Sequence, residues 1–165
     1  MSICAVILAI LWSMASSCPH IRTNGDPGVA CLIEEASRAS ATFRSLVTAI
    51  DGRNGLVYVE GGKCGHSVCA CMTLSVREAG PHRILRILFD LRRDLTELLG
   101  ALAHELQHAL EVLGDVRVTS TQAAYLFYAQ VAPTADDRFE TDAAIRVGVQ
   151  VEREVLASRA RRAQP

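Results

Sequence analysis

Hydrophobic residues first recur along the chain at helical spacing and then alternate as in strands. From Val29 to Ile50 the apolar positions have the spacing of an amphipathic helix, which Gly52 is expected to end. Three β-rich stretches follow, at residues 56–60, 68–76 and 84–89. Because the connections between them are short and rich in glycine, the pattern predicts an antiparallel meander of three strands.

The second half of the chain returns to helical spacing. Asp94 is expected to cap, and Gly114 to end, a long helix whose apolar positions are 95, 98, 99, 102, 106, 109, 110 and 113. A helix from Thr119 or Ser120 through Tyr128, ended by Pro133, and a last helix over 138–159 complete the pattern. The order predicts a single α+β domain, in which a small antiparallel sheet packs on the long helix and further helices follow.

The first residues have the pattern of a targeting segment. The run from Ile3 to Ala15 is apolar, but its length of about 13 residues is below the roughly 20 that a membrane span needs. We expect a signal peptide over 1–17, a linker over 18–28 and the domain proper over 29–165. The small residues before Cys18 also resemble a loose lipobox, in which Cys18 would carry a lipid anchor. The alternative is a buried N-terminal helix.

Export to the periplasm or beyond changes what the cysteines are expected to do. In an oxidising compartment, Cys64 and Cys71 could form a disulfide, since they flank a turn between two predicted strands. Two alternatives stay open. One is a structural zinc site at Cys64, His66, Cys69 and Cys71, and the other is free buried thiols.

Composition and charge exclude two other classes of protein. The chain has 165 residues, 50% of them hydrophobic, with 17 Lys and Arg against 18 Asp and Glu. This apolar share can fill the core of one domain, so wholesale disorder is excluded. Nucleic-acid binders concentrate basic residues, so we expect no nucleic-acid partner. The basic tail at Arg159, Arg161 and Arg162 is explained by favourable charge at a helix C-terminus.

The long predicted helix contains the sequence His104-Glu105-Leu106-Gln107-His108. Residues four apart share a helix face, so both imidazoles can reach one metal ion while Glu105 lies beside it. Zinc suits two imidazoles and a carboxylate, and it leaves a fourth position for a water whose pKa it lowers. Glu105 could take the proton of that water during attack on a peptide carbonyl. The alternative, two polar side chains on a solvent face, fits poorly with the surrounding Leu and Ala residues.

The segment Leu102–Glu111 resembles the active-site helix of the zincin metallopeptidases. The resemblance implies an antiparallel sheet with helices, an edge strand that binds an extended peptide, and Zn²⁺ held by His104 and His108. It also implies Glu105 as the catalytic base. Metzincins need a third His after the second, and none follows His108, so the resemblance is to the gluzincins. Further segments are similar to a group of small bacterial proteins regarded as metallopeptidases without a known substrate: Ala41–Arg44, Val57–Glu60 and Phe139–Ala144.

Gluzincins take their third ligand from a Glu on a later helix, and Glu140 is the expected counterpart. The segment Phe139–Ala144 resembles their Glu-x-x-Ala motif, in which small residues let two helices pack closely. Glu140 could instead only supply negative charge to a helix N-terminus. Asp142 is the second choice as ligand and Glu111 the third, because three ligands from one straight helix converge poorly on a tetrahedral ion. Otherwise we expect Glu111 and Asp142 to support the ligands from behind.

Peptide hydrolysis also needs a hydrogen-bond donor for the oxyanion. Tyr128 is the expected catalytic donor, with Tyr125 and His66 as alternatives.

The sequence thus predicts an exported zinc peptidase acting on a peptide or protein. A first alternative is an exported metal-binding protein or lipoprotein that binds a peptide or cell-wall component without turnover. A second is a di-iron protein, which is disfavoured because such sites need two Glu-x-x-His segments and the chain has one.

Overall fold

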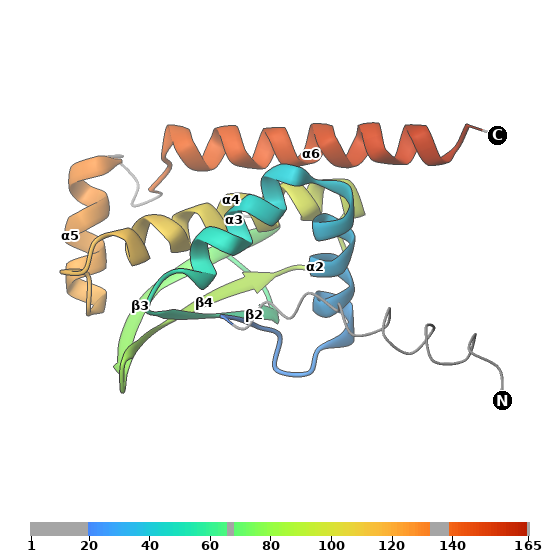
Figure 1. Ribbon diagram of the computed structural model, residues 1–165. Helices are drawn as coiled ribbons and strands as arrows, with labels where there is room; N and C mark the ends of the chain where they lie inside the picture. The colour runs from blue at the N-terminus through green and yellow to red at the C-terminus, as the bar shows by residue number, and fades with distance from the viewer. Residues whose placement is uncertain (1–19, 66–67, 133–138, 165) are drawn as a thin grey trace, which may run out of the picture.

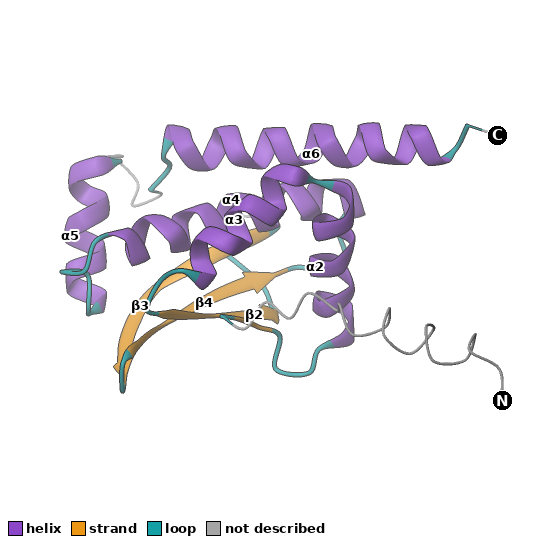
Figure 2. Cartoon of the chain, in the orientation of Figure 1, coloured by secondary structure: helices purple, strands orange, loops and turns teal. Residues whose placement is uncertain are grey.

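The computed structural model of the protein describes residues 20–65, 68–132 and 139–164. The predicted signal peptide, Cys18 and His66 lie outside the described residues. Within them the chain forms an α+β fold of five helices and a four-stranded mixed sheet (Figures 1 and 2). The elements are β1 (Ile21–Arg22), α2 (Pro27–Ala39), α3 (Ala41–Asp51), β2 (Gly55–Gly61), β3 (Ala70–Ala79), β4 (His82–Phe89), α4 (Leu95–Gly114), α5 (Thr121–Val131) and α6 (Asp142–Arg162).

The sheet has the strand order β1-β2-β4-β3, and the prediction of an antiparallel meander is wrong. Only β3 and β4 form the expected hairpin, which turns at Gly80 with a positive φ of 60°. Strand β4 then inserts between β2 and β3, so that β2 and β4 run parallel. Strand β4 therefore separates β2 from β3, which are not paired with each other, and β3 becomes an edge strand.

A disulfide joins Cys64, shortly after the end of β2, to Cys71 of the edge strand β3. The Sγ atoms of Cys64 and Cys71 are 2.03 Å apart, which is the pairing expected from the sequence. The bond uses two of the three cysteines of the alternative zinc site, so that alternative is wrong. Cys31 and Cys69 are free thiols.

The predicted helix from Val29 to Ile50 is in fact two helices that meet at Ser40. The Ser40 side chain accepts a hydrogen bond from the Phe43 backbone N–H at 3.0 Å and so caps α3, while its own N–H ends α2 by donating to the Ala36 carbonyl. The buried positions of α2 and α3 follow each other at helical spacing through this break. The apolar pattern alone therefore does not indicate the boundary.

The predicted linker over 18–28 is, in its described part, an ordered piece of the fold. Ile21 and Arg22 form β1, which pairs in parallel with β2. Asp26 caps α2 by accepting from the backbone N–H groups of Gly28 and Val29, and Pro27 starts the helix. The turn-forming residues of this segment thus make a strand and a helix start.

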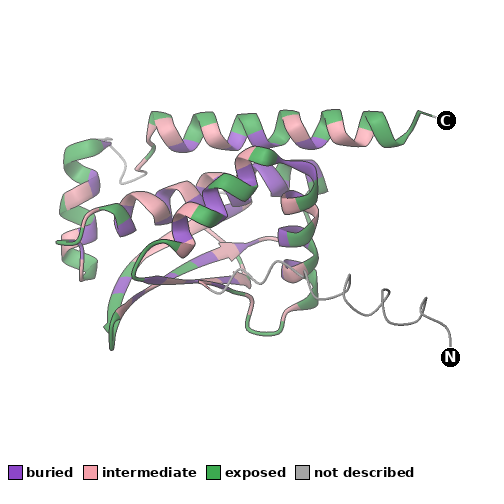
Figure 3. Cartoon of the chain, in the orientation of Figure 1, coloured by how far each residue is buried: buried purple, intermediate pink, exposed green. Residues whose placement is uncertain are grey.

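The helices form two layers above the sheet. In Figure 1, α3 and α4 lie over the sheet and α6 crosses above both of them. The alternate residues of β2 and β4 that face the helices are buried, and so is the sheet-facing side of α4 (Figure 3). The core at this interface contains Val57, Val59, Leu85, Ile87, Phe89, Leu99, Leu102 and Leu106. This packing fixes α4 between the sheet and α6.

None of the described helices is long and apolar enough to cross a membrane.

Candidate metal centre

Helix α4 carries both histidines, and each of its ends is held by a specific side chain. Asp94 accepts from the backbone N–H groups of Thr96 and Glu97 at the start. At the other end, the guanidinium of Arg83 from β4 is 2% exposed and donates to the carbonyls of Val112, Leu113, Asp115 and Val118. A buried cation at the negative end of a helix is favourable. The face of α4 that carries His104 and His108 therefore has a fixed position over the sheet.

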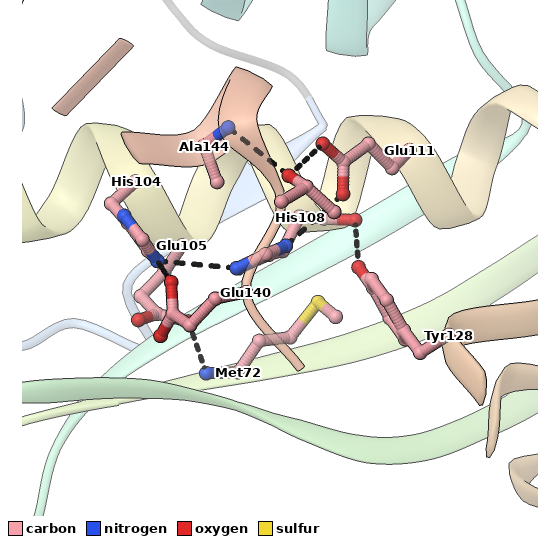
Figure 4. Close-up of polar contacts among 9 residues, drawn as sticks. Met72, His104, Glu105, His108, Glu111, Tyr128, Glu140 and Ala144 are labelled. Carbon is pink, nitrogen blue, oxygen red and sulfur yellow. Dashed lines mark hydrogen bonds and ion pairs between the residues drawn. The ribbon is translucent and has the colours of Figure 1, made fainter. Parts of the chain in front are cut away.

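His104, His108 and Glu140 converge at the face of α4 that lies below the start of α6 (Figure 4). His104 Nε2 lies 3.1 Å from His108 Nε2 and 3.0 Å from Glu140 Oε2. Donor atoms around a tetrahedral ion with bonds of about 2.0–2.1 Å lie about 3.3 Å apart. One ligand atom from each residue lies within 4.8 Å of the others, so small side-chain movements would complete the geometry. The three residues could hold a metal ion.

Glu111 orients His108 from behind, as expected from the sequence. Its Oε2 atom lies 3.0 Å from His108 Nδ1. Because an ionised carboxylate only accepts hydrogen bonds, this contact places the imidazole proton on Nδ1 and leaves the Nε2 lone pair free for a metal. Burial alone would raise the pKa of Glu111, but the hydrogen bonds from His108 and Thr141 outweigh it and lower that pKa.

The environment of His104 favours a positive charge at its Nε2 atom. Burial acts to lower the pKa of His104, but the hydrogen bond to Glu140 and the negative charges of Glu105 and Glu140 outweigh it, so the pKa is raised. The same negative charges of Glu105 and Glu140 would stabilise a metal cation bound between His104 and Glu140. The donor set and its charge thus fit a divalent metal.

Glu140 lies just before α6, where the sequence predicted a position on the helix itself. The predicted start near residue 138 is wrong, because Thr141 is the N-cap and α6 begins at Asp142. The Thr141 hydroxyl accepts from the Ala144 N–H at 3.1 Å and donates to Glu111 Oε1 at 2.7 Å. Glu111 therefore fixes His108 on α4 and also the residue next to Glu140.

Glu105 points from α4 to the edge strand of the sheet. Its side chain is 9% exposed, and Oε2 accepts a hydrogen bond of 2.6 Å from the Met72 backbone N–H of β3. Burial raises the pKa of Glu105, and the neighbouring histidines act in the opposite direction. A carboxyl with a raised pKa, beside a metal site, can both accept and return a proton near neutral pH.

A cavity of about 500 Å³ opens over these residues. It lies between β3, α4 and the start of α6, and His104, Glu105, His108 and Glu140 all line it. Met72 and Leu74 of β3 form part of its apolar wall. The candidate metal centre thus lies in a cleft along the edge strand.

Tyr128 lines the cavity, but its hydroxyl donates a hydrogen bond to the backbone of α4. It donates to the His108 backbone carbonyl at 2.9 Å, and the ring is 1% exposed and stacks on Phe139. Burial raises the pKa of Tyr128, which keeps the phenol protonated. The structure therefore gives Tyr128 a supporting role beneath His108 and does not bear out the catalytic hydroxyl expected from the sequence.

The other expected residues lie away from the three converging donor atoms. Asp142 is an exposed residue whose carboxylate lies 3.9 Å from Arg146, and it is not among the three donors that converge. It lies in the first turn of α6, whereas Glu140, which precedes the cap, contacts His104. Tyr125 is 44% exposed and packs edge-on against Phe139.

Sequence reasoning missed the residues that let α6 approach α4. A Cβ atom on Gly148 would lie 3.1 Å from the Gly100 carbonyl oxygen and 3.2 Å from His104 Cβ. Two helices can come this close only where both lack side chains, so these glycines set the distance between the histidines and Glu140. The role of Thr141 could have been found from its preference for helix N-caps. No pattern in the sequence indicates the contact between Glu105 and the Met72 backbone.

Comparisons with models of known families, with curated proteins and with solved structures find no match to this chain. The metal-binding interpretation therefore depends on the geometry of His104, His108 and Glu140.

Proposed function

We propose that the protein is a zinc-dependent peptidase. The observation that carries the proposal is the convergence of two imidazole nitrogens and a carboxylate in a cleft beside an edge strand. Glu105 lies between this group of candidate ligands and the edge strand. The disulfide between Cys64 and Cys71 supports export to an oxidising compartment, as the apolar N-terminal segment predicts. A lipid on Cys18 and a peptide or protein substrate belong to the same proposal.

Zinc is the metal that the donor set favours. Two histidines and one carboxylate are a common ligand set of catalytic zinc sites, which keep a fourth position open. The di-iron alternative needs more carboxylates than are present, since the described residues contain one group of three candidate ligands.

An extended peptide would bind along β3. The Met72 N–H faces Glu105 and not β4. Because successive residues of an antiparallel strand alternate in direction, the main-chain groups of Ala70 face the cleft on the same side as those of Met72, while the pairing of β3 with β4 becomes irregular after Thr73. An exposed strand edge of this kind can pair with a peptide through main-chain hydrogen bonds. Such pairing would hold the scissile bond over His104 and His108.

Glu105 would act as the general base and then as the general acid. When bound, zinc supplies a Lewis acid that activates a water and polarises the carbonyl that the water attacks. Glu105 accepts the proton of the attacking water, for which its carboxylate must turn from the Met72 N–H toward the cleft. It then delivers this proton to the leaving amine. Glu140 neutralises the added positive charge, and Glu111 holds His108 in the ligating orientation.

Substitution of Glu105 by Gln tests the proposal. We expect the zinc-loaded wild type to cleave members of an unstructured peptide mixture, and Glu105→Gln to lose at least about 100-fold in rate while it keeps its zinc. Glu34→Gln, an exposed change on α2, should cleave at the wild-type rate. Mass spectrometry of the products gives the rate, and metal analysis gives the zinc content.

Two results would contradict the proposal. Equal cleavage by wild type and Glu105→Gln would assign the activity to another base or another protein. Zinc binding with peptide affinity but no cleavage by any variant would favour the alternative of an exported binding protein.

A further inference from the structure

The cleft extends beyond the metal centre toward the start of α4. One side is β3 with the residues that precede it, the floor is α4, and the other side is α6. Three exposed apolar residues form its rim: Val68, Ile145 and Val149. The space is therefore larger than a metal site needs, and its walls suit the side chains of a bound chain.

Two carboxylates lie at the far end of this cleft. Glu97 on α4 and Glu152 on α6 both line the cavity, and both are exposed. Glu152 packs over Gly100, since its Oε2 atom lies 3.7 Å from where a Cβ of Gly100 would be. Among the described residues neither carboxylate has an ion-pair partner, and no Lys or Arg lines the cavity.

Arg159 of α6 also lies near the start of α4, where it donates to the Thr96 hydroxyl at 2.6 Å. With Glu105 and Glu140, the cleft thus carries four carboxylates on its lining, of which only two belong to the reaction proposed above. A cleft with apolar walls and surplus negative charge is complementary to a chain that carries a cation.

The distance from these carboxylates to the metal ligands defines where that cation would lie. Glu97 precedes His104 by seven residues of helix, which corresponds to about 10 Å at 1.5 Å per residue. An extended peptide advances about 3.3 Å per residue, so the same distance covers about three residues.

The direction follows from the edge strand. Strand β3 and helix α4 run the same way along the cleft, since the Cys69 carbonyl just before β3 accepts from Asp90, which shortly precedes α4, and Met72 donates to Glu105 further along both elements. Antiparallel pairing is the more stable choice for a single added strand. A peptide antiparallel to β3 would have its C-terminal part at the Glu97 end.

We propose that the cleft selects peptides with an Arg or Lys about three residues to the C-terminal side of the cleaved bond, recognised by Glu97 and Glu152. This inference rests on the proposed peptidase function for the identity of the cleaved bond. The binding preference itself depends only on the cleft and its charge.

Peptide binding to the zinc-loaded Glu105→Gln variant tests the preference without turnover. The probes are fluorescent peptides that are identical except for one position, which is arginine or its neutral isostere citrulline. We expect the arginine peptide to bind about five- to tenfold tighter, and the ratio to fall as salt is raised. Adding Glu97→Gln and Glu152→Gln should bring the ratio close to one, whereas adding Glu34→Gln should leave the ratio unchanged.

The outcomes separate this inference from the proposed function. A ratio near one in the parent variant, or a ratio that survives loss of both carboxylates, would overturn the inference even if the wild type cleaves peptides. A carboxylate-dependent preference in a protein that cleaves none of them would support the inference for a binding cleft and refute the peptidase. In wild-type digests, basic residues enriched on the N-terminal side of the cut would refute the antiparallel direction.

Discussion

Arg83 provides the most demanding test of how α4, the helix that carries both candidate histidine ligands, is held in place. Its guanidinium is buried between β4 and the end of α4 and donates to four backbone carbonyls and to Asn54 Oδ1. Burial lowers the pKa of Arg83, but an arginine stays charged in proteins. Arg83→Met keeps much of the side-chain volume and removes every donor.

The cost can be worked out from these contacts. A hydrogen bond to a charged group contributes about 1.5–3 kcal/mol, and the desolvation of the guanidinium offsets a part of the sum. We therefore expect Arg83→Met to lower the free energy of unfolding by about 3–5 kcal/mol, a large share of the 5–15 kcal/mol typical of a domain. Arg83→Lys should lose less, because the ammonium keeps the charge but cannot reach all five acceptors.

Urea unfolding followed by circular dichroism measures this difference. Arg77→Met on β3 is the matched control, since Arg77 is exposed and the change should stay within about 0.5 kcal/mol. A loss below about 1 kcal/mol for Arg83→Met would refute the reasoning, because the carbonyls at the end of α4 would then be satisfied without Arg83.

Three further predictions concern the supports of the site. Glu111→Gln should weaken zinc affinity about 10- to 100-fold in a chelator competition, while Asp142→Asn leaves it unchanged. Gly148→Ala should push α6 away from α4, costing about 1–3 kcal/mol in urea unfolding and weakening zinc binding, whereas Gly114→Ala, which has open space around it, should do neither. The pKa of Glu154 is lowered to about 2, because hydrogen bonds from Ser40, Gln150 and Thr42 outweigh its burial. Since this pKa lies below the unfolded value, the stabilisation is present above about pH 4.5 and is lost as the pH falls toward 2. The unfolding free energy of Glu154→Gln should therefore fall less than that of the wild type over this range, and an equal fall in both would contradict the assignment.

Local signals in the sequence predicted helix α4 and the hairpin of β3 and β4. The apolar spacing from Leu95 to Leu113, with Asp94 before it, defines α4 because capping and amphipathicity are local properties. The same reasoning put His104 and His108 on one face with Glu105 beside them. It also placed Glu111 behind His108, since residues three apart are neighbours on a helix.

The missed helix boundaries at Ser40 and Thr141 are local caps, but the other errors involve contacts between distant segments. Whether β2 pairs with β3 or with β4 depends on how strands from different parts of the chain pack together, and the glycines after β2 are compatible with either pairing. The two residues of β1 are too few to show a strand period. The close approach of Gly100 and Gly148 needs both helices in place, and so does the choice of Glu140 over Asp142.

Metal analysis of the folded protein, beside His104→Ala, Glu140→Ala and the control Asp142→Ala, tests the central claim most directly. The geometry of the three ligands leads us to expect about one zinc per chain in the wild type and in the control, and loss of zinc in the other two variants. A folded wild type that takes up no zinc, or variants that bind it as well as the wild type does, would contradict the metal centre.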